Sequence, residues 1–199
     1  MFEKILEFEH ALAEFTGAPY AISTDCCTHA IELCLIYDQV TDCKITPFTY
    51  LSIPMTLHKL NINYKYLDHE WQRWVGEYPI LGTRIWDSAR LLKPNMYRNG
   101  SIQCLSFGHG KPLNNNRGGA ILLDDKKSYD SLIKMRYDGR DLSVSPWIEQ
   151  SEFKLGFHYK LNPEECVSAL TKLIQYKESN NYEPIYVEYP DCRRIKIVK

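Results

Sequence analysis

The sequence predicts an α/β fold of three layers, in which a mostly parallel sheet has helices on both faces. Two observations predict it. Segments with the apolar spacing of helices alternate along the chain with short apolar segments that are typical of buried strands. The composition is that of a globular protein, with 199 residues of which 44% are hydrophobic and 25% are charged. At about 150 residues per domain, this length corresponds to one domain with a small appendage.

The first half of the chain alternates helix and strand. Phe8, Leu12 and Phe15 have the i, i+4, i+7 spacing of an amphipathic helix, which should end at Gly17. The same reasoning continues along the sequence and predicts a strand at 21–23, a helix at 30–36, a strand that leads into Pro47, a helix at 52–60 and a strand at 62–66.

The second half repeats the alternation. Strands are expected at 84–86, 102–105 and 120–123, and a helix at 126–136. The last helix has the clearest local signature, because Asn162 can cap it, Pro163 suits its first position and Glu165 its third. After Tyr176 the chain becomes polar and irregular.

Charge and cysteine usage narrow the class of protein. The 24 basic and 25 acidic residues give a net charge of −1, so no global positive field attracts nucleic acid or an anionic membrane. The first residues are amphipathic, so we expect neither a signal peptide nor a membrane span. The seven cysteines form no C-x-x-C pair, which favours reduced thiols and no metal site. These features predict a cytoplasmic protein.

Three polar clusters follow predicted strands: TDCCT at 24–28, DSAR at 87–90 and SFGHGK at 106–111. Taken singly, each is a weak signal. The turn at 24–28 and Asp87 are equally consistent with helix capping, and most lysines placed like Lys111 lie in exposed loops. Ligands of α/β sheets bind beyond the carboxyl ends of strands, so the clusters should form one site. The helix start near Thr28 offers free amides to an anion, Asp87 can pair with a protonated ring nitrogen, and Lys111 can form a Schiff base. Phosphate, pyridinium and aldehyde together describe pyridoxal phosphate.

Longer stretches enclose these clusters, namely AEFTGAPYAISTDCCTHAIEL, TPFTYLSIP, IWDSARLL, SFGHGKPLNNNRGGAILL and LGFHYKLNPEECVSAL. They lie in this order within residues 11–174, and with them the chain resembles the DegT/DnrJ/EryC1/StrS sugar aminotransferases, which have the aspartate-aminotransferase fold (fold type I). The resemblance implies a large, pyridoxal-phosphate-binding α/β domain at 1–176. It also implies that the family's C-terminal small domain is largely missing, with a remnant segment at 177–199.

The resemblance implies roles for individual residues. Lys111 falls on the Schiff-base lysine and Asp87 on the acid that pairs with the pyridine nitrogen, and both are catalytic in the family. His158 falls on a residue that reaches the cofactor phosphate of the neighbouring subunit, which implies a homodimer with shared active sites. The other implied cofactor-binding positions are Cys26, Cys27 and Thr28 in the phosphate turn, Ser106 at the phosphate, Tyr50 stacked on the ring and Arg90 near the phenolic oxygen.

The sequence departs from the family pattern at some of these positions. Cys27 replaces a glycine, so the phosphate turn carries a side chain where the backbone needs close approach. Arg90, His158, Arg117 and Lys160 replace the family's Gln, Asn, Glu and Arg. We expect the cofactor chemistry to be retained despite these departures, whereas the family's substrate recognition does not carry over to this sequence.

The implied activity is ping-pong transamination between a small-molecule amino donor and a keto acceptor, which the resemblance suggests is a nucleotide-linked keto-sugar. Some relatives with His at the lysine position are dehydratases, and Lys111 argues against that activity here. Two alternatives remain open. One is a pyridoxal phosphate enzyme for another substrate, such as a modified nucleotide, and the other is a non-catalytic protein that keeps the fold for dimerisation or scaffolding.

Overall fold

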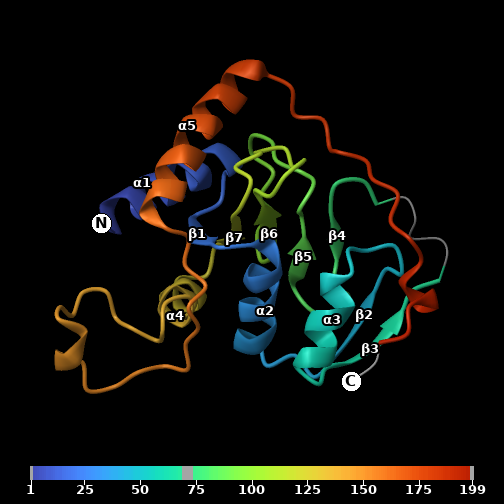
Figure 1. Cartoon of the computed structure of the whole chain (residues 1–199), viewed down its shortest axis with the longest axis horizontal. Helices are drawn as coiled ribbons and strands as arrows, with labels where there is room; N and C mark the ends of the chain where they lie inside the picture. The colour runs from blue at the N-terminus through green and yellow to red at the C-terminus, as the bar shows by residue number, and fades with distance from the viewer. Residues whose placement is uncertain (1, 69–73, 198–199) are drawn as a thin grey trace.

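The computed structural model describes residues 2–68 and 74–197. Its main sheet has the strand order β1-β7-β6-β5-β4, and β2 and β3 form a separate pair (Figure 1). The helices and strands, in chain order, are α1 (Phe2–Thr16), β1 (Tyr20–Thr24), α2 (Cys27–Tyr37), β2 (Asp42–Ile45), α3 (Ser52–Lys59), β3 (Asn63–Tyr66), β4 (Tyr78–Pro79), β5 (Ile85–Asp87), β6 (Ile102–Ser106), β7 (Gly119–Leu123), α4 (Lys126–Met135) and α5 (Pro163–Ser179).

Local sequence signals set the ends of several helices. α1 ends where Gly17 adopts a φ of +74°, a conformation that costs glycine little. α5 begins with the expected capping box, in which the Asn162 backbone donates to the Glu165 carboxylate at 3.0 Å. The helices and strands predicted from the sequence are all present in the structure. β4 is an additional strand that the sequence reasoning did not identify.

The α/β class and the helices on both faces are confirmed, but the pairing within the sheet is mixed. β5 and β6 pair in parallel, as do β2 and β3. The other three pairs, β1–β7, β6–β7 and β4–β5, are antiparallel, which corrects the expectation of a mostly parallel sheet. β4 is joined to β5 by residues 80–84 and β6 to β7 by residues 107–118, and neither connection contains a helix. A chain that returns without a crossover helix pairs antiparallel with the strand that it has just left.

The mixed sheet still gathers the polar clusters at one edge. β1, β5 and β6 run in the same direction, because β1 and β6 are both antiparallel to β7 and β5 is parallel to β6. These are the three strands that the polar clusters follow. Their carboxyl ends therefore lie at the same edge of the sheet.

The core lies on both faces of this sheet. Ile121 and Leu123 of β7 pack against α2 and α4 on one face, whereas Leu122 packs against α1 and α5 on the other. Such alternation is the normal consequence of side chains pointing to opposite faces of a strand. Figure 1 shows α1 and α5 side by side, away from α2.

The segment after α5 runs back along the molecule toward β2 and β3 (Figure 1). We call residues 184–195 the C-terminal strap. The Ile185 amide donates to the Arg90 carbonyl at 3.0 Å, and the Cys192 amide donates to the Pro47 carbonyl at 2.9 Å. These bonds attach the strap at both of its ends. None of the helices in the described ranges has the length and hydrophobicity needed to span a membrane.

Candidate active site

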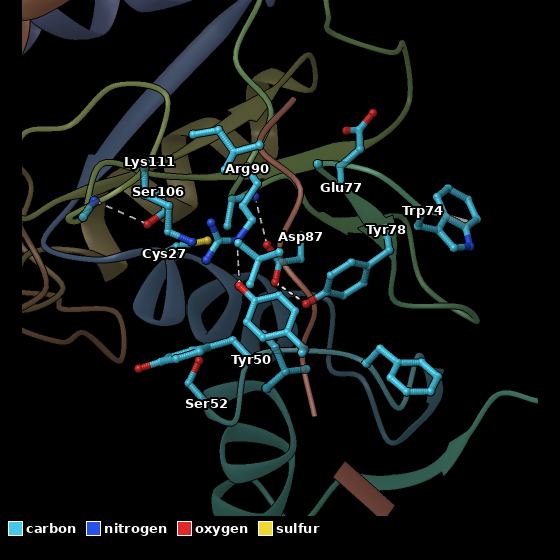
Figure 2. Close-up of a pocket in the computed structure, with 18 of the residues that line it drawn as sticks. Cys27, Tyr50, Ser52, Trp74, Glu77, Tyr78, Asp87, Arg90, Ser106 and Lys111 are labelled. Atoms are coloured by element: carbon cyan, nitrogen blue, oxygen red, sulfur yellow. Dashed lines mark hydrogen bonds between the residues drawn. The ribbon is translucent and has the colours of Figure 1, made fainter. Parts of the chain in front are cut away.

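A cavity of about 680 Å³ opens at the edge of the sheet where β1, β5 and β6 end (Figure 2). Its walls also include the loop before α3 and residues of the C-terminal strap. Eight of the nine predicted site residues line it: Cys26, Cys27, Thr28, Tyr50, Asp87, Arg90, Ser106 and Lys111. The structure therefore brings together residues that are separated by up to 85 positions in the sequence.

The first wall is the turn that leads into α2. Cys26 is the N-cap of this helix, and its Sγ accepts from the His29 amide at 3.4 Å. The Thr28 hydroxyl at the start of the helix donates to the Ser52 hydroxyl at 2.9 Å. The first amides of a helix carry a partial positive charge and lack intrahelical acceptors. The turn can therefore bind an anion such as a phosphate.

Cys27 is the residue that the resemblance aligns with a glycine, and the structure shows how its side chain is accommodated. The thiol is buried and donates to the Cys104 carbonyl at 3.6 Å, which directs it toward β6. Burial raises the pKa of this thiol well above its usual value, so it stays neutral. The glycine that the turn does require is Gly119 on β7, where an added Cβ would lie only 2.5 Å from the Cys26 carbonyl carbon.

The second wall carries a buried carboxylate. Asp87 ends β5 and is 5% exposed. Its Oδ2 accepts from the Tyr78 hydroxyl at 2.5 Å, and its Oδ1 accepts from the Ala89 amide at 3.0 Å (Figure 2). Burial raises the pKa of Asp87, and these hydrogen bonds together with the charge of Lys111 oppose that rise. A cation bound in the cavity would therefore lie next to a carboxylate that is shielded from water.

The third wall carries an amine with altered acidity. Lys111 follows β6 in a turn whose backbone closes onto the Gly108 carbonyl at 3.3 Å. Burial and the neighbouring charge of Arg90 lower the pKa of the Lys111 amine. A lower pKa increases the fraction of neutral, nucleophilic amine at neutral pH, as required for attack on an aldehyde.

Three tyrosines that sequence reasoning missed also line the cavity, namely Tyr78, Tyr186 and Tyr189. Tyr78 comes from β4, a strand of two residues that is too short to show a periodic pattern. Tyr189 comes from the C-terminal strap, and its hydroxyl accepts from the Arg90 Nε at 2.8 Å. No local signal links Tyr189 to Arg90, because the two residues are 99 positions apart.

His158, the ninth predicted site residue, lies outside the cavity of its own chain. Its imidazole is 68% exposed, and Nδ1 lies 3.0 Å from Oδ2 of Asp138. This position neither tests nor excludes a role at the site of a second subunit, so that role stays a prediction.

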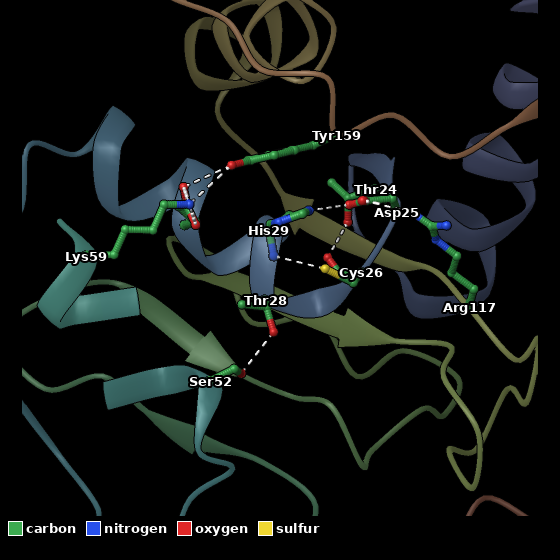
Figure 3. Close-up of polar contacts among 10 residues, drawn as sticks. Thr24, Asp25, Cys26, Thr28, His29, Ser52, Lys59, Arg117 and Tyr159 are labelled. Atoms are coloured by element: carbon green, nitrogen blue, oxygen red, sulfur yellow. Dashed lines mark hydrogen bonds and ion pairs between the residues drawn. The ribbon is translucent and has the colours of Figure 1, made fainter. Parts of the chain in front are cut away.

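A second polar cluster lies beside the phosphate turn (Figure 3). His29 Nδ1 is 2.6 Å from Oδ1 of Asp25, whose Oδ2 accepts from Arg117 at 3.2 Å. The His29 ring also stacks on Tyr159 with 3.6 Å between centroids. The hydrogen bond to Asp25 raises the pKa of His29 to about 9. Ligand atoms of Asp25, Cys26 and His29 are close enough for a metal, but both oxygens of Asp25 already face cations, so we interpret the cluster as an ion-pair network.

Comparisons with known proteins give the family and the fold of the chain. Residues 1–76 and 96–183 match the DegT/DnrJ/EryC1/StrS aminotransferase family. No curated protein shows significant similarity to the chain. Lys111, Ser106 and the phosphate turn lie within the matched segments, whereas Asp87 and Arg90 lie between them.

Several solved structures share the fold. They include the sugar aminotransferase CalS13 from Micromonospora echinospora, with 18% identity and a TM-score of 0.75 over 88% of this chain and 61% of that one. Helicobacter pylori PseC, an aminotransferase involved in the biosynthesis of pseudoaminic acid, has 16% identity and a TM-score of 0.70 over 88% and 58% of the two chains. GDP-4-keto-6-deoxy-D-mannose-3-dehydratase from E. coli, solved with bound hydrated PLP, has 13% identity and a TM-score of 0.75 over 89% and 61%.

The chain spans about three fifths of the length of these structures. The similarity to CalS13 nevertheless covers 88% of this chain, and the family match takes in most of the sequence. The chain belongs to the DegT/DnrJ/EryC1/StrS aminotransferase family.

Proposed function

We propose that the protein binds pyridoxal phosphate in the cavity at the edge of the sheet and uses it to transfer an amino group to a keto acceptor. The observation that carries this proposal is the meeting of the Lys111 amine, the buried Asp87 carboxylate and the start of α2 in a single cavity. These groups are complementary to the aldehyde, the ring nitrogen and the phosphate of the cofactor. Gly119 supports the fit, because any larger residue there would displace the turn.

Five of the residues that line the cavity then have a role. The hydroxyls of Thr28 and Ser106 and the first amides of α2 would hold the phosphate. Asp87 would pair with the ring nitrogen, and Tyr50 at the mouth of the cavity would cover the ring. When bound, the cofactor accepts the electron pair of the substrate's Cα–H bond. The Lys111 amine would hold the aldehyde carbon before the reaction and would carry the proton from the substrate α-carbon during it.

The substrates belong to the same proposal. An amino donor and a nucleotide-linked keto-sugar are suggested by the similar structures, among them CalS13 and a structure of DesI described as containing its TDP-sugar product. One observation favours an acceptor of another kind. Residues 185–189 of the strap line the cavity, and they lie beyond the segments that match the family. A different acceptor, such as a modified nucleotide, is therefore the second candidate.

The proposal includes a cytoplasmic homodimer with shared sites. His158 belongs to a long loop between α4 and α5, and this loop exposes large apolar side chains that a monomer leaves uncovered, with Ile148 at 74% and Leu155 at 72%. If His158 acts at the site of the partner, the inactive variants Lys111→Ala and His158→Ala should regain activity when their subunits are exchanged. A mixture that stays inactive after confirmed exchange would exclude the crossing role of His158.

The proposed cofactor can be tested directly on the purified chain. Adding pyridoxal phosphate should produce visible absorbance, and borohydride should then fix the cofactor covalently at Lys111, as located by mass spectrometry. Lys111→Ala should lose the adduct. Lys127→Ala, which removes a lysine from α4 away from the cavity, should retain it. An adduct at another lysine, or none in the wild-type protein, would refute the proposal.

A further inference from the structure

We propose that Tyr78 is a positioning residue, which holds the Asp87 carboxylate in place so that it can pair with a ring nitrogen. This inference rests on the proposed function, because it assumes that Asp87 faces the pyridine ring. Tyr78 lies in the segment between the two parts of the chain that match the family. Its role therefore has to be argued from the contacts in this structure.

The sheet register brings the two residues together. β4 and β5 are antiparallel, and Tyr78 lies directly opposite Asp87. Residues opposite each other in such a pair point to the same face of the sheet, with their side chains adjacent. The Tyr78 hydroxyl lies 2.5 Å from Oδ2 of Asp87, and Figure 2 shows both side chains at the cavity. β4 thus places a single donor at the carboxylate.

With Asp87 ionised, the hydrogen bonds around Tyr78 have one consistent direction. An ionised carboxylate only accepts, so the single proton of the Tyr78 hydroxyl must be donated to Asp87. The Thr49 hydroxyl also contacts the Tyr78 hydroxyl and must therefore be the donor in that bond. Thr49 is 1% exposed, so bulk solvent does not reach its side chain. Thr49 thus donates to Tyr78, and Tyr78 donates to an anionic Asp87, so the three side chains form one chain of hydrogen bonds.

Among the described residues, removing the Tyr78 hydroxyl would leave the Ala89 amide, at 3.0 Å, as the hydrogen-bond donor to Asp87. Burial raises the pKa of Asp87, and the Tyr78 hydrogen bond is the largest of the effects that lower it. Burial and Asp87 raise the pKa of Tyr78, so the phenol stays a neutral donor. The other titratable groups around Asp87 are Cys27 of α2, Cys104 of β6, Arg90, Lys111 and Tyr189.

The test compares two cofactor probes on two variants. Tyr78→Phe keeps the ring and removes the hydroxyl, and Tyr97→Phe is the matched control because its hydroxyl donates to the Ser101 carbonyl at 2.7 Å, away from the cavity. The probes are pyridoxal phosphate and its analogue with CH in place of the ring nitrogen. Tyr78→Phe should bind pyridoxal phosphate about 10- to 100-fold more weakly than the wild type, as expected for the loss of a hydrogen bond to a charged group. It should bind the analogue as the wild type does.

A loss of affinity for both probes, or for neither, would overturn the role of Tyr78. A wild-type protein that binds no pyridoxal phosphate would refute the proposed function instead. In that case the inference can still be tested in the cofactor-free protein. NMR would follow the signal of the Asp87 carboxyl carbon as the pH is changed, and the Asp87→Asn variant would assign that signal. The apparent pKa of Asp87 should rise in Tyr78→Phe and stay unchanged in Tyr97→Phe. An unchanged pKa in both variants would show that Tyr78 does not control Asp87.

Discussion

Replacing Gly119 by alanine should destabilise the protein and weaken its affinity for a phosphate. Gly119 lies on β7, paired with Thr24 on one side and Ser106 on the other, directly behind the turn that begins α2. A Cβ built there would lie 2.5 Å from the Cys26 carbonyl carbon and 2.5 Å from the Cys27 nitrogen. Both atoms belong to the backbone, so no side-chain rotation can relieve the contact.

The size of the effect follows from the geometry. Ordinary contact begins at 3.4 Å, so the turn would have to retreat by about 0.9 Å. It is held by the bond from the Ala30 amide to the Cys26 carbonyl at 3.1 Å, which such a shift would strain. Overpacking of this kind typically costs about 1–3 kcal/mol. In a chain of this size each kcal/mol lowers Tm by roughly 2–4 °C, so Tm should fall by about 2–12 °C.

Thermal unfolding monitored by circular dichroism measures this change, and a titration with pyridoxal phosphate measures the affinity. Gly108→Ala is the control, because its Cβ would have only the Ser106 hydroxyl nearby, at an ordinary 3.7 Å. The control should unfold within about 1 °C of the wild type, as substitutions without new contacts usually do. Gly119→Ala with the same Tm as Gly108→Ala would refute the reasoning that Gly119 is required by the close approach of the turn.

Two further predictions concern ion pairs. Arg136→Met should reduce the free energy of unfolding by about 3–5 kcal/mol, because it leaves the 2%-exposed Glu9 carboxylate without its cationic partner. Urea denaturation measures this loss. A double variant that also carries Glu9→Gln should recover part of it, because the buried charge is then removed as well. Stability should also fall as pH rises through about 9. The pKa of His29 is raised from 6.5 to about 9 in the folded state, so its contribution is complete below about 6.5 and disappears above about 9. Because the His29 side chain is partly exposed, we expect only about 1 kcal/mol between pH 6 and pH 10. His29→Gln should have a flatter pH profile, and equal profiles would contradict the assignment.

The sequence was sufficient wherever the structure depends on neighbours along the chain. The capping box of α5 needs only Asn162, Pro163 and Glu165, and it is present as expected. The meeting of Asp87 and Lys111 was also predictable, because each follows a strand and the strands concerned share a direction. Short-range patterns therefore gave the elements and most of the candidate site.

The remaining features depend on contacts between distant residues. The direction of β7 is fixed by its loop and by its pairing with β1, and neither leaves a periodic signal. β4 has two residues and ends in Pro79, so it reads as a turn. Tyr189 contacts Arg90 because the C-terminal strap runs back across the cavity, and no local sequence pattern indicates that course. For these reasons the mixed pairing and two of the tyrosines that line the cavity could not be predicted.

The pairing of β1 with β7 has a consequence for synthesis on the ribosome. Thr24 finds its partner only at Gly119, about 95 residues later. At a translation rate of about 5–20 residues per second, β1 emerges roughly 5–20 s before the strand that covers its edge. During that interval Ala21 and Ile22, which are buried in the finished fold, belong to an uncovered strand. The nascent chain is then open to pairing with other chains, and a chaperone that binds this segment would protect it until β7 has been made.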